Sequence, residues 1–333
     1  MNIKYLFELG GENTELGKYE ALELLKTEKY APKIIFDNGN IIVIEVTDEI
    51  KVRVAQRLAM TKRLSKIVFY DKEEELDISL KKIDEIDIGD CSFAIRSLNK
   101  ENQPENILAK KLGEKIPSKN NINLSQPDVK ILYYKDKMNI ISIWDKNKET
   151  YYKRCLEHHI KHRPFFSPIS IHPRIARSMV NFSNCTVKNK IIDPFCGTGG
   201  ILIEIANMKI AGIGIDILDK MIESSIGNLK HYNLEAEIVQ GDIQKIQDYD
   251  IDAIVTDPPY GISTTTKGEG IEELMFRSLS LFDKKLKVGQ RLVMAISKPE
   301  LIQNKNFKIL YQFKWYIHKS LTRNIIVMEK INT

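Results

Sequence analysis

The chain has 333 residues, a formal net charge of +5, 43% hydrophobic residues and 29% charged residues, which is the composition of an ordinary globular protein. This length is sufficient for two or three domains, each with its own hydrophobic core. The longest apolar runs are too short and too interrupted to cross a bilayer, and the N-terminus lacks a signal-peptide cleavage pattern, so we expect a cytoplasmic protein that does not span a membrane.

The first seventy residues alternate between strand and helix patterns. The predicted order is a strand at 4–10, a helix at 12–29, strands at 31–37 and 40–46, a helix at 47–61 and a strand at 63–70. The βαββαβ order is that of a split βαβ arrangement, a sheet with helices on one face. We therefore predict an α+β, ferredoxin-like domain over residues 1–71.

Residues 72–150 form a second predicted domain, with strands near 91–98, 129–135 and 139–145 and a helix near 105–116. Between Ser92 and Arg163 there are 15 Lys and Arg residues against 8 Asp and Glu residues, a balance of +7. Such a surplus is typical of a phosphate-binding module, although a solvated lysine-rich face would give the same count.

Residues 151–170 are rich in charge and proline, which indicates a linker between domains. His158 and His162 within it have the i, i+4 spacing of a helix, but no carboxylate partner accompanies them at a recognised metal-ligand spacing. The four cysteines show no close pairing either. We therefore expect no metal and no disulfide framework, and a surface turn or an RNA-facing contact for the two histidines.

Residues 171–333 alternate regularly between apolar strand patterns and amphipathic helix patterns. Predicted strands lie at 189–195, 211–217, 236–242, 252–258, 291–297 and within 307–330, and predicted helices at 199–208, 220–232 and 271–282. This alternation predicts a parallel, doubly wound α/β sheet, which binds ligands beyond the carboxyl ends of its strands.

The first predicted strand of this domain is followed by DPFCGTGG and then a helix. Gly197 and Gly199 allow a tight turn and a close approach of the backbone to a ligand at a helix N-terminus. Such a loop alone fits NAD, another nucleotide or a structural turn. The acidic residues near the loop help to decide between these possibilities.

Acidic residues end three successive predicted strands. Asp216 lies about twenty residues beyond the glycine loop, where a carboxylate can hold both hydroxyls of a ribose. Asp242 ends the next strand, and Asp193 precedes the loop itself. Each acid alone could cap a loop. Together they favour a cationic ligand such as S-adenosylmethionine over the pyrophosphate of NAD.

The strand DAIVT runs into DPPYG, at the ligand end of the predicted sheet. Amino groups on planar bases are poor nucleophiles because their lone pair is delocalised into the ring. The Asp257 carboxylate and the Pro258 carbonyl could accept hydrogen bonds from such an amine, while Pro258 and Pro259 restrict the backbone and Tyr260 offers a face for an unstacked base. The alternative is a rigid turn that only ends a buried strand.

The series DPFCGTGG, GID, GD and DPPYG resembles class I S-adenosylmethionine-dependent methyltransferases that methylate amino groups. The segments RPFFSPISIHPRIARSMVN, DPPYGISTTTKGE and HKSLTR are similar to those of archaeal tRNA guanine-N2 methyltransferases acting at position ten, which carry ferredoxin-like and THUMP domains before the catalytic domain. The segments CSFAIRSLNK, ENILAKKLGEKI and NLSQPDVKILYYK resemble THUMP sequences.

The resemblance implies a Rossmann-like methyltransferase domain at 171–333, a ferredoxin-like domain at 1–71 and a THUMP domain at 72–150. It assigns S-adenosylmethionine to Asp193, Pro194, Phe195, Gly197, Gly199, Asp216, Ile217, Asp242 and Ile243. It assigns the chemistry to Asp257, Pro258, Pro259 and Tyr260. The predicted RNA contacts are Arg96, Lys110, Lys111 and Arg163.

The predicted activity is methylation of guanosine N2 in tRNA at position 10, giving N2-methylguanosine and N2,N2-dimethylguanosine. We expect a monomer with tRNA as its partner, and the resemblance also allows a small activating protein. Alternatives are a related enzyme acting on another tRNA guanine, on adenine N6 or on a glutamine side chain, and a non-catalytic RNA-binding protein. The last would be expected to lack Asp216 or Asp257, and both are present.

Overall fold

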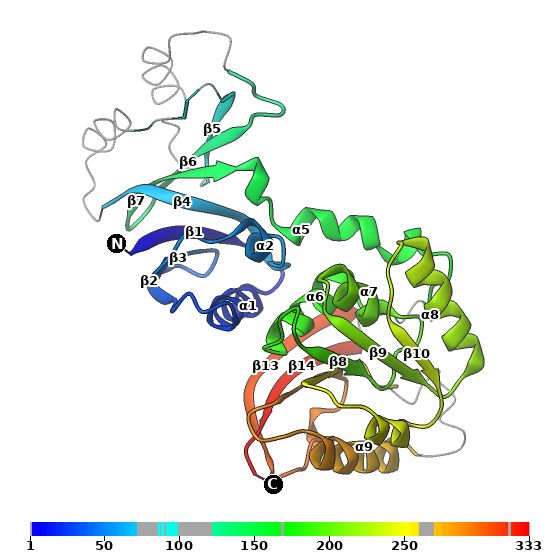
Figure 1. The fold of residues 1–333 in the computed structure, drawn as a ribbon. Helices are drawn as coiled ribbons and strands as arrows, with labels where there is room; N and C mark the ends of the chain where they lie inside the picture. Colours follow the sequence, from blue (N-terminus) through cyan, green and yellow to red (C-terminus); the bar gives the residue numbers. More distant parts are fainter. Residues whose placement is uncertain are drawn as a thin grey trace. The chain divides into compact units, whose positions relative to one another are not determined.

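The computed structural model describes residues 2–71, 86, 88–89, 91–98, 122–167, 170–259, 270–318 and 321–332 (Figure 1). The chain divides into two compact units. Unit 1 comprises 1–14, 30–56 and 61–151, and unit 2 comprises 15–29, 57–60 and 152–333. No helix of the described residues combines the length and the apolar character that crossing a bilayer requires.

Unit 1 is built on one sheet, which among the described residues has the strand order β2-β3-β1-β4-β7-β6-β5. Its strands are β1 (Ile3–Leu9), β2 (Lys33–Asp37), β3 (Ile41–Val46), β4 (Thr61–Asp71), β5 (Phe93–Ser97), β6 (Val129–Lys135) and β7 (Asn139–Asp145). β4 pairs with β1 on one side and with β7 on the other, antiparallel in both cases. The strands of the two predicted N-terminal domains therefore share one sheet, and the predicted boundary at residues 71 and 72 stays a prediction.

The predicted helix at 47–61 is wrong in length, because α2 covers only Val52–Ala55. The hydroxyl oxygens of Tyr5 and Tyr30 accept hydrogen bonds from the backbone N–H groups of Ile50 and Lys51, which holds the chain before the helix in another conformation. Side-chain partners thus replace helical ones for these backbone groups.

Unit 2 contains a largely parallel sheet with the order β10-β9-β8-β11-β12-β14-β13 among the described residues. Its strands are β8 (Lys190–Asp193), β9 (Ala211–Asp216), β10 (Glu237–Gln240), β11 (Ala253–Thr256), β12 (Arg291–Ile296), β13 (Phe307–His318) and β14 (Leu321–Lys330). Its main helices are α6 (Pro173–Phe182), α7 (Gly200–Asn207), α8 (Asp219–His231) and α9 (Ile271–Lys285). The predicted doubly wound α/β arrangement is confirmed, with β14 antiparallel to β12.

Alternate residues of the central strands enter different cores, because successive side chains of a strand point to opposite faces. Val255 packs in the core that contains residues of α6 and α7, whereas Ile254 packs in the core that contains residues of α9. On β9 both Gly212 and Gly214 face α7, and a Cβ added to Gly214 would lie 2.5 Å from a methyl carbon of Leu202. This glycine allows α7 to pack closely on the sheet.

The helix α1 (Thr14–Thr27) belongs largely to unit 2, although its sequence lies within the predicted N-terminal domain. The fully buried carboxylate of Glu20 accepts hydrogen bonds from the N–H groups of Ala59 and Met60 and from Asn181 of α6. Burial raises the pKa of Glu20 to about 7. Hydrogen bonds thus join α1, the segment 57–60 and α6 within one unit.

Candidate active site

The predicted site residues lie on the ends of the parallel strands of unit 2. β8 ends at Asp193, β9 ends at Asp216, and β11 ends at Thr256, one residue before Asp257. The strand β8 lies in the sheet between β9 and β11. The connection that follows β8 leads to β9 on one side of it, and the later strand β11 lies on its other side, so the strand order reverses at β8. Loops separate at such a switch point, and ligands of open α/β sheets bind there.

The glycine loop crosses this switch point. Gly197 has a φ of 51° and Gly199 a φ of 82°, both in the left-handed region that favours glycine. The N–H of Gly197 donates to Asp216 Oδ2 at 2.9 Å, so the loop is tied to the end of β9. No atom of the described residues lies within 4 Å of the position that a Cβ on Gly197 would occupy, which leaves space beside the loop in that part of the chain. The helix α7 begins directly after it, and the first backbone N–H groups of a helix have no partner within the helix.

Asp193 is buried, with 2% of its surface exposed. Its Oδ1 accepts hydrogen bonds from the hydroxyl of Thr256 at 2.7 Å and from the N–H of Phe195 at 3.2 Å. Burial raises its pKa to about 7, and the negative charges of Asp257 and Asp216 add to this effect. Burial also raises the pKa of Asp216. A cation bound beside these carboxylates would stabilise their charged forms.

Asp242 follows β10 and caps a short 3-10 helix, where its Oδ1 accepts from the N–H of Gln244. It also forms a two-pronged ion pair with Arg277 of α9, with Nη1–Oδ1 and Nη2–Oδ2 distances of 2.7 and 3.0 Å. This hydrogen-bonded pair lowers the pKa of Asp242. Of the two predicted apolar contacts, Ile243 is buried and Ile217 is half-buried. Sequence patterns gave no sign of Arg277, because its partner is 35 residues away.

Asp257 and the two prolines follow directly after β11, as predicted. Pro258 is buried, Pro259 is half-buried, and the Asp257 side chain is 14% exposed. Asp257 Oδ2 lies 3.1 Å from Nη2 of Arg323, which is on β14. Tyr260 lies outside the described residues. Arg323 belongs to the segment HKSLTR, but nothing in the spacing of that segment indicated its partner.

A segment before the predicted catalytic domain also contacts the glycine loop. The buried Asn228 of α8 accepts a hydrogen bond from the N–H of Phe165 and donates to the carbonyl oxygens of Phe165 and Thr198. One side-chain amide thus joins α8, the glycine loop and the stretch around Phe165. The sequence contained one sign of this role: Asn228 is a polar residue on the same face of α8 as Ser225 and Leu229, which are buried, and buried polar side chains usually have hydrogen-bond partners.

The predicted RNA contacts have different surroundings. Arg96 is half-buried on β5, and its guanidinium donates to the carbonyl oxygens of Ile95 and Leu124, both at 2.8 Å. Arg163 is only 4% exposed and donates to the carbonyl oxygen of His158, which does not fit a contact with RNA phosphates. Lys110 and Lys111 lie outside the described residues.

The prediction of a surface turn or RNA-facing contact is wrong for His158, whose ring is buried. Its Nδ1 lies 3.2 Å from Oε1 of Glu204, and Oε2 of the same carboxylate accepts from Arg177. Glu204 is fully buried, so these partners offset the cost of burying its charge. No group of three or more potential metal-ligating side chains was found in the described part of the chain.

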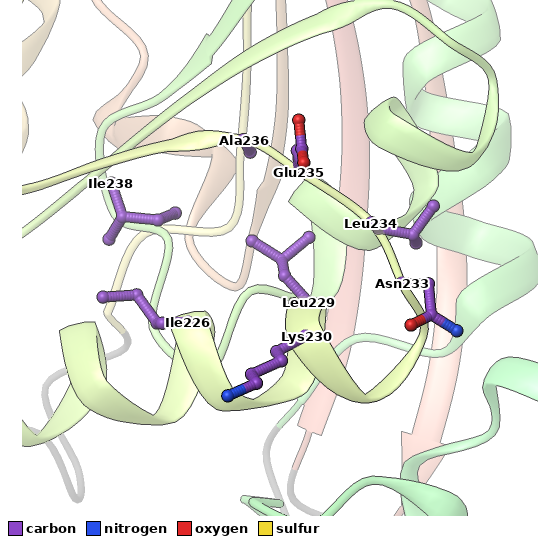
Figure 2. Close-up of a pocket in the computed structure, with 8 residues that line it drawn as sticks. All are labelled: Ile226, Leu229, Lys230, Asn233, Leu234, Glu235, Ala236 and Ile238. Atoms are coloured by element: carbon purple, nitrogen blue, oxygen red, sulfur yellow. The ribbon is translucent and has the colours of Figure 1, made fainter.

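A surface hollow of about 430 Å³ lies between α8 and the start of β10, as Figure 2 shows. Its apolar lining includes Ile226, Leu229 and Ile238, and its charged lining includes Lys230 and Glu235. None of the predicted site residues that the structure describes lines this hollow, so it is separate from the site at the strand ends.

Comparisons with known proteins place these features in a family context. Residues 161–314 match the family model described as RMKL-like, methyltransferase domain. The chain is 31% identical over 337 residues to a tRNA (guanine(10)-N2)-dimethyltransferase of Methanothermobacter thermautotrophicus, covering 97% of this chain and 98% of the relative. It is 30% identical over 366 residues to the protein of that name in Methanocaldococcus jannaschii, covering 98% of this chain and 99% of the relative.

The fold is similar to that of a solved structure of TrmN from Thermus thermophilus. The TM-score is 0.58 and the identity 15%, over 98% of this chain and 100% of that one. This likeness supports the mixed α/β class I methyltransferase fold.

Proposed function

The chain belongs to the tRNA (guanine(10)-N2)-dimethyltransferase family, and from this premise we propose that it transfers methyl groups from S-adenosylmethionine to N2 of a guanosine in tRNA. The proposed target is position 10, with N2-methylguanosine and N2,N2-dimethylguanosine as successive products. The observation that carries the proposal is the meeting of Asp193, Asp216 and Asp257 beside the glycine loop, at the switch point of the sheet.

The residues at this switch point fit S-adenosylmethionine. The buried carboxyl of Asp193, with its pKa of about 7, would be stabilised in its charged form by a cationic ligand. The open space beside Gly197 and the N-terminus of α7 allow a close approach to the backbone. We assign the ribose to Asp216 and the adenine to Asp242, Ile217 and Ile243. Pro194, Phe195 and Gly199 complete the proposed cofactor contacts.

When bound, S-adenosylmethionine supplies an electrophilic methyl group, whose bond to sulfur breaks as its bond to nitrogen forms, and the amine then loses one proton. Asp257 and the Pro258 carbonyl accept hydrogen bonds from the amino group and direct its lone pair towards the methyl carbon. Pro258 and Pro259 limit the motion of these acceptors. Tyr260, outside the described residues, is proposed to stack on the extruded base.

RNA binding is assigned to unit 1, whose segment from Ser92 onwards includes much of the positive surplus. Ferredoxin-like and THUMP domains, at 1–71 and 72–150, are part of the proposal, as is a linker at 151–170. Arg96, Lys110 and Lys111 are the proposed phosphate contacts, and the burial of Arg163 argues against including it. If these lysines contact phosphates, replacing both with Gln should reduce the salt dependence of tRNA affinity, measured as Kd at two ionic strengths.

We also propose a cytoplasmic monomer, with a small activating protein as a partner to be tested. Size-exclusion chromatography with light scattering would measure the mass of the isolated protein. A mass near twice the 38.4 kDa of one chain would contradict the monomer.

The decisive experiment is incubation of the protein with labelled S-adenosylmethionine and an unmodified tRNA transcript, followed by mapping of the methylated nucleoside. We expect label in N2-methylguanosine first and in N2,N2-dimethylguanosine later, both lost when position 10 of the transcript is changed from G to A. Label only in N6-methyladenosine would contradict the guanine assignment.

A further inference from the structure

Arg323 is a buried arginine whose charge is directed at the proposed catalytic acceptor. Its side chain is 3% exposed, and its Nη2 lies 3.1 Å from Oδ2 of Asp257. Both residues belong to unit 2. Burying a guanidinium has a substantial desolvation cost, and burying an ion pair in place of apolar side chains commonly brings no net stability. The location of this pair therefore calls for another explanation.

The topology of the sheet brings Arg323 to this position. β11 and β12 are parallel, with Thr256 opposite Met294, whereas β14 runs antiparallel to β12, with Met294 opposite Ile326. The beginning of β14 therefore lies at the carboxyl ends of β11 and β12. Arg323 is three residues before Ile326, which places it level with the residues that follow Thr256.

The backbone next to Arg323 is also fixed. The side chain of Asn324 donates to the carbonyl oxygens of Ile296 and Ser297, at 3.3 and 3.4 Å. These hydrogen bonds join the beginning of β14 to the end of β12. The Arg323 guanidinium therefore extends from an anchored strand.

The charges around Asp257 explain what this guanidinium does. In the described part of unit 2, the charged groups near Asp257 include two others at the ends of neighbouring strands. Asp193 of β8 interacts electrostatically with both Asp257 and Asp216, and Arg323 of β14 pairs with Asp257. Neighbouring carboxylates favour the protonated form of one another, whereas an adjacent arginine favours the charged form. A protonated Asp257 would be a weaker acceptor for an amino group.

We propose that Arg323 is a positioning residue for methyl transfer, which orients the Asp257 carboxylate and keeps it ionised so that it can accept hydrogen bonds from the amino group of the base. This inference rests on the proposed function. An acceptor paired with arginine is also a weak base, so Asp257 orients the amine, and the proton released after transfer passes to solvent.

The test compares Arg323→Gln and Arg323→Lys with the wild type, using single-turnover methylation of an unmodified tRNA transcript between pH 5.5 and 9. We expect Arg323→Gln to lower the transfer rate about 100-fold at neutral pH and to move the acid limb of its pH profile to higher pH. Arg323→Lys retains the positive charge but not the planar, two-pronged guanidinium, so its transfer rate should be about tenfold lower than that of the wild type. Affinity for S-adenosylhomocysteine and the KM for tRNA should change less than about threefold.

Arg291→Gln is the matched control. Arg291 is a buried arginine of the same sheet that pairs with Glu23 at 2.6 Å, at the opposite end of the strands. Its loss should lower the melting temperature without moving the pH profile. This control separates a general effect of removing a buried arginine from the specific effect on Asp257.

A second arm places Arg323→Gln in an Asp257→Asn background. If Arg323 acts through Asp257, the double variant should transfer methyl groups no more slowly than Asp257→Asn alone. A wild-type rate and pH profile for Arg323→Gln would overturn the inference, as would an unchanged acid limb with a slower rate. If the wild-type protein labels no tRNA, the proposed function itself is wrong.

Discussion

At the amino end of the unit 2 sheet, the carboxylate of Glu23 is surrounded by Arg291, Lys26 and the Tyr311 hydroxyl, whereas at the carboxyl end Asp193 faces two further carboxylates. Burial would raise the pKa of Glu23, but its hydrogen bond with Lys26 and the charge of Arg291 lower it overall. The pKa of Asp193 rises to about 7 instead. At the amino end, cationic partners therefore neutralise the buried Glu23 carboxylate, which favours stability. At the carboxyl end, the grouped carboxyl groups produce a negative potential that favours binding of a cation.

Removal of the Asp257 carboxylate, at the carboxyl end of the sheet, should greatly reduce methyl transfer while cofactor affinity is retained. Asp257→Ala should lower the methyl-transfer rate by at least about 1000-fold, because the amino group loses its carboxylate acceptor. Affinity for S-adenosylhomocysteine, measured by calorimetry, should stay within about threefold of the wild type. The matched control is Asp250→Ala, at a surface aspartate whose side chain is 90% exposed. A fully active Asp257→Ala variant would show that Asp257 is not the acceptor for the amino group.

The opposite outcome is expected at the amino end. Arg291→Gln should lower the free energy of unfolding by about 2 to 4 kcal/mol, because it leaves a buried carboxylate with fewer partners. Lys26 and Tyr311 still contact Glu23, which limits the loss. Chemical denaturation measures this change, and the transfer rate at a temperature well below the melting point should equal that of the wild type. A slower transfer rate would mean that the two ends are not independent.

The raised pKa of Asp193 predicts a pH dependence of ligand affinity. Below about pH 7 this carboxyl holds a proton that a cationic ligand must displace, so affinity for S-adenosylmethionine should rise about tenfold per pH unit up to about 7 and then level off. S-adenosylhomocysteine, whose sulfur is a neutral thioether, should show a weaker rise of affinity with pH. Asp193→Asn should bind more weakly and with a flat profile. An Asp193→Asn variant with the wild-type slope would assign the titration to another group.

The raised pKa of Asp193 has the opposite consequence for the stability of the ligand-free protein, which should fall as the pH rises. The folded state holds the Asp193 proton between the ordinary carboxyl pKa of 3.8 and about 7, whereas the unfolded chain has released it. The contribution of Asp193 to stability is therefore present at low pH and is lost as the pH rises through this window. Denaturation of the ligand-free protein at pH 5.5 and 7.5, with Asp193→Asn as the comparison, measures it.

A small effect is expected for the partly exposed ion pair between Arg277 and Asp242. Arg277→Gln removes the ion pair with Asp242, whose partners are 29% and 38% exposed, and should weaken cofactor binding by about threefold. The loss should diminish further at high salt, because solvent screens the pair. A 100-fold loss would place Arg277 among the principal cofactor contacts.

Local patterns were sufficient for most elements of the fold. The predicted strands at 129–135 and 139–145 coincide with β6 and β7, and the alternation after residue 188 gave the parallel sheet, because strand and helix periodicities depend on neighbouring residues. The positions of Asp193, Asp216 and Asp257 at strand ends followed from the same patterns. The helix predicted at 47–61 failed because tyrosine hydroxyls distant in the sequence bind the backbone before it.

The sequence alone was sufficient to identify the glycine loop, the order of the acids beside it and the DPPY tetrapeptide, since each follows from local patterns of neighbouring residues. Their partners depend on the three-dimensional fold: Arg323 pairs with Asp257, Arg277 pairs with Asp242, Asn228 contacts the glycine loop, and α1 belongs largely to unit 2. These pairings join residues tens to hundreds of positions apart. They follow from strand order and helix packing, which local periodicity does not specify.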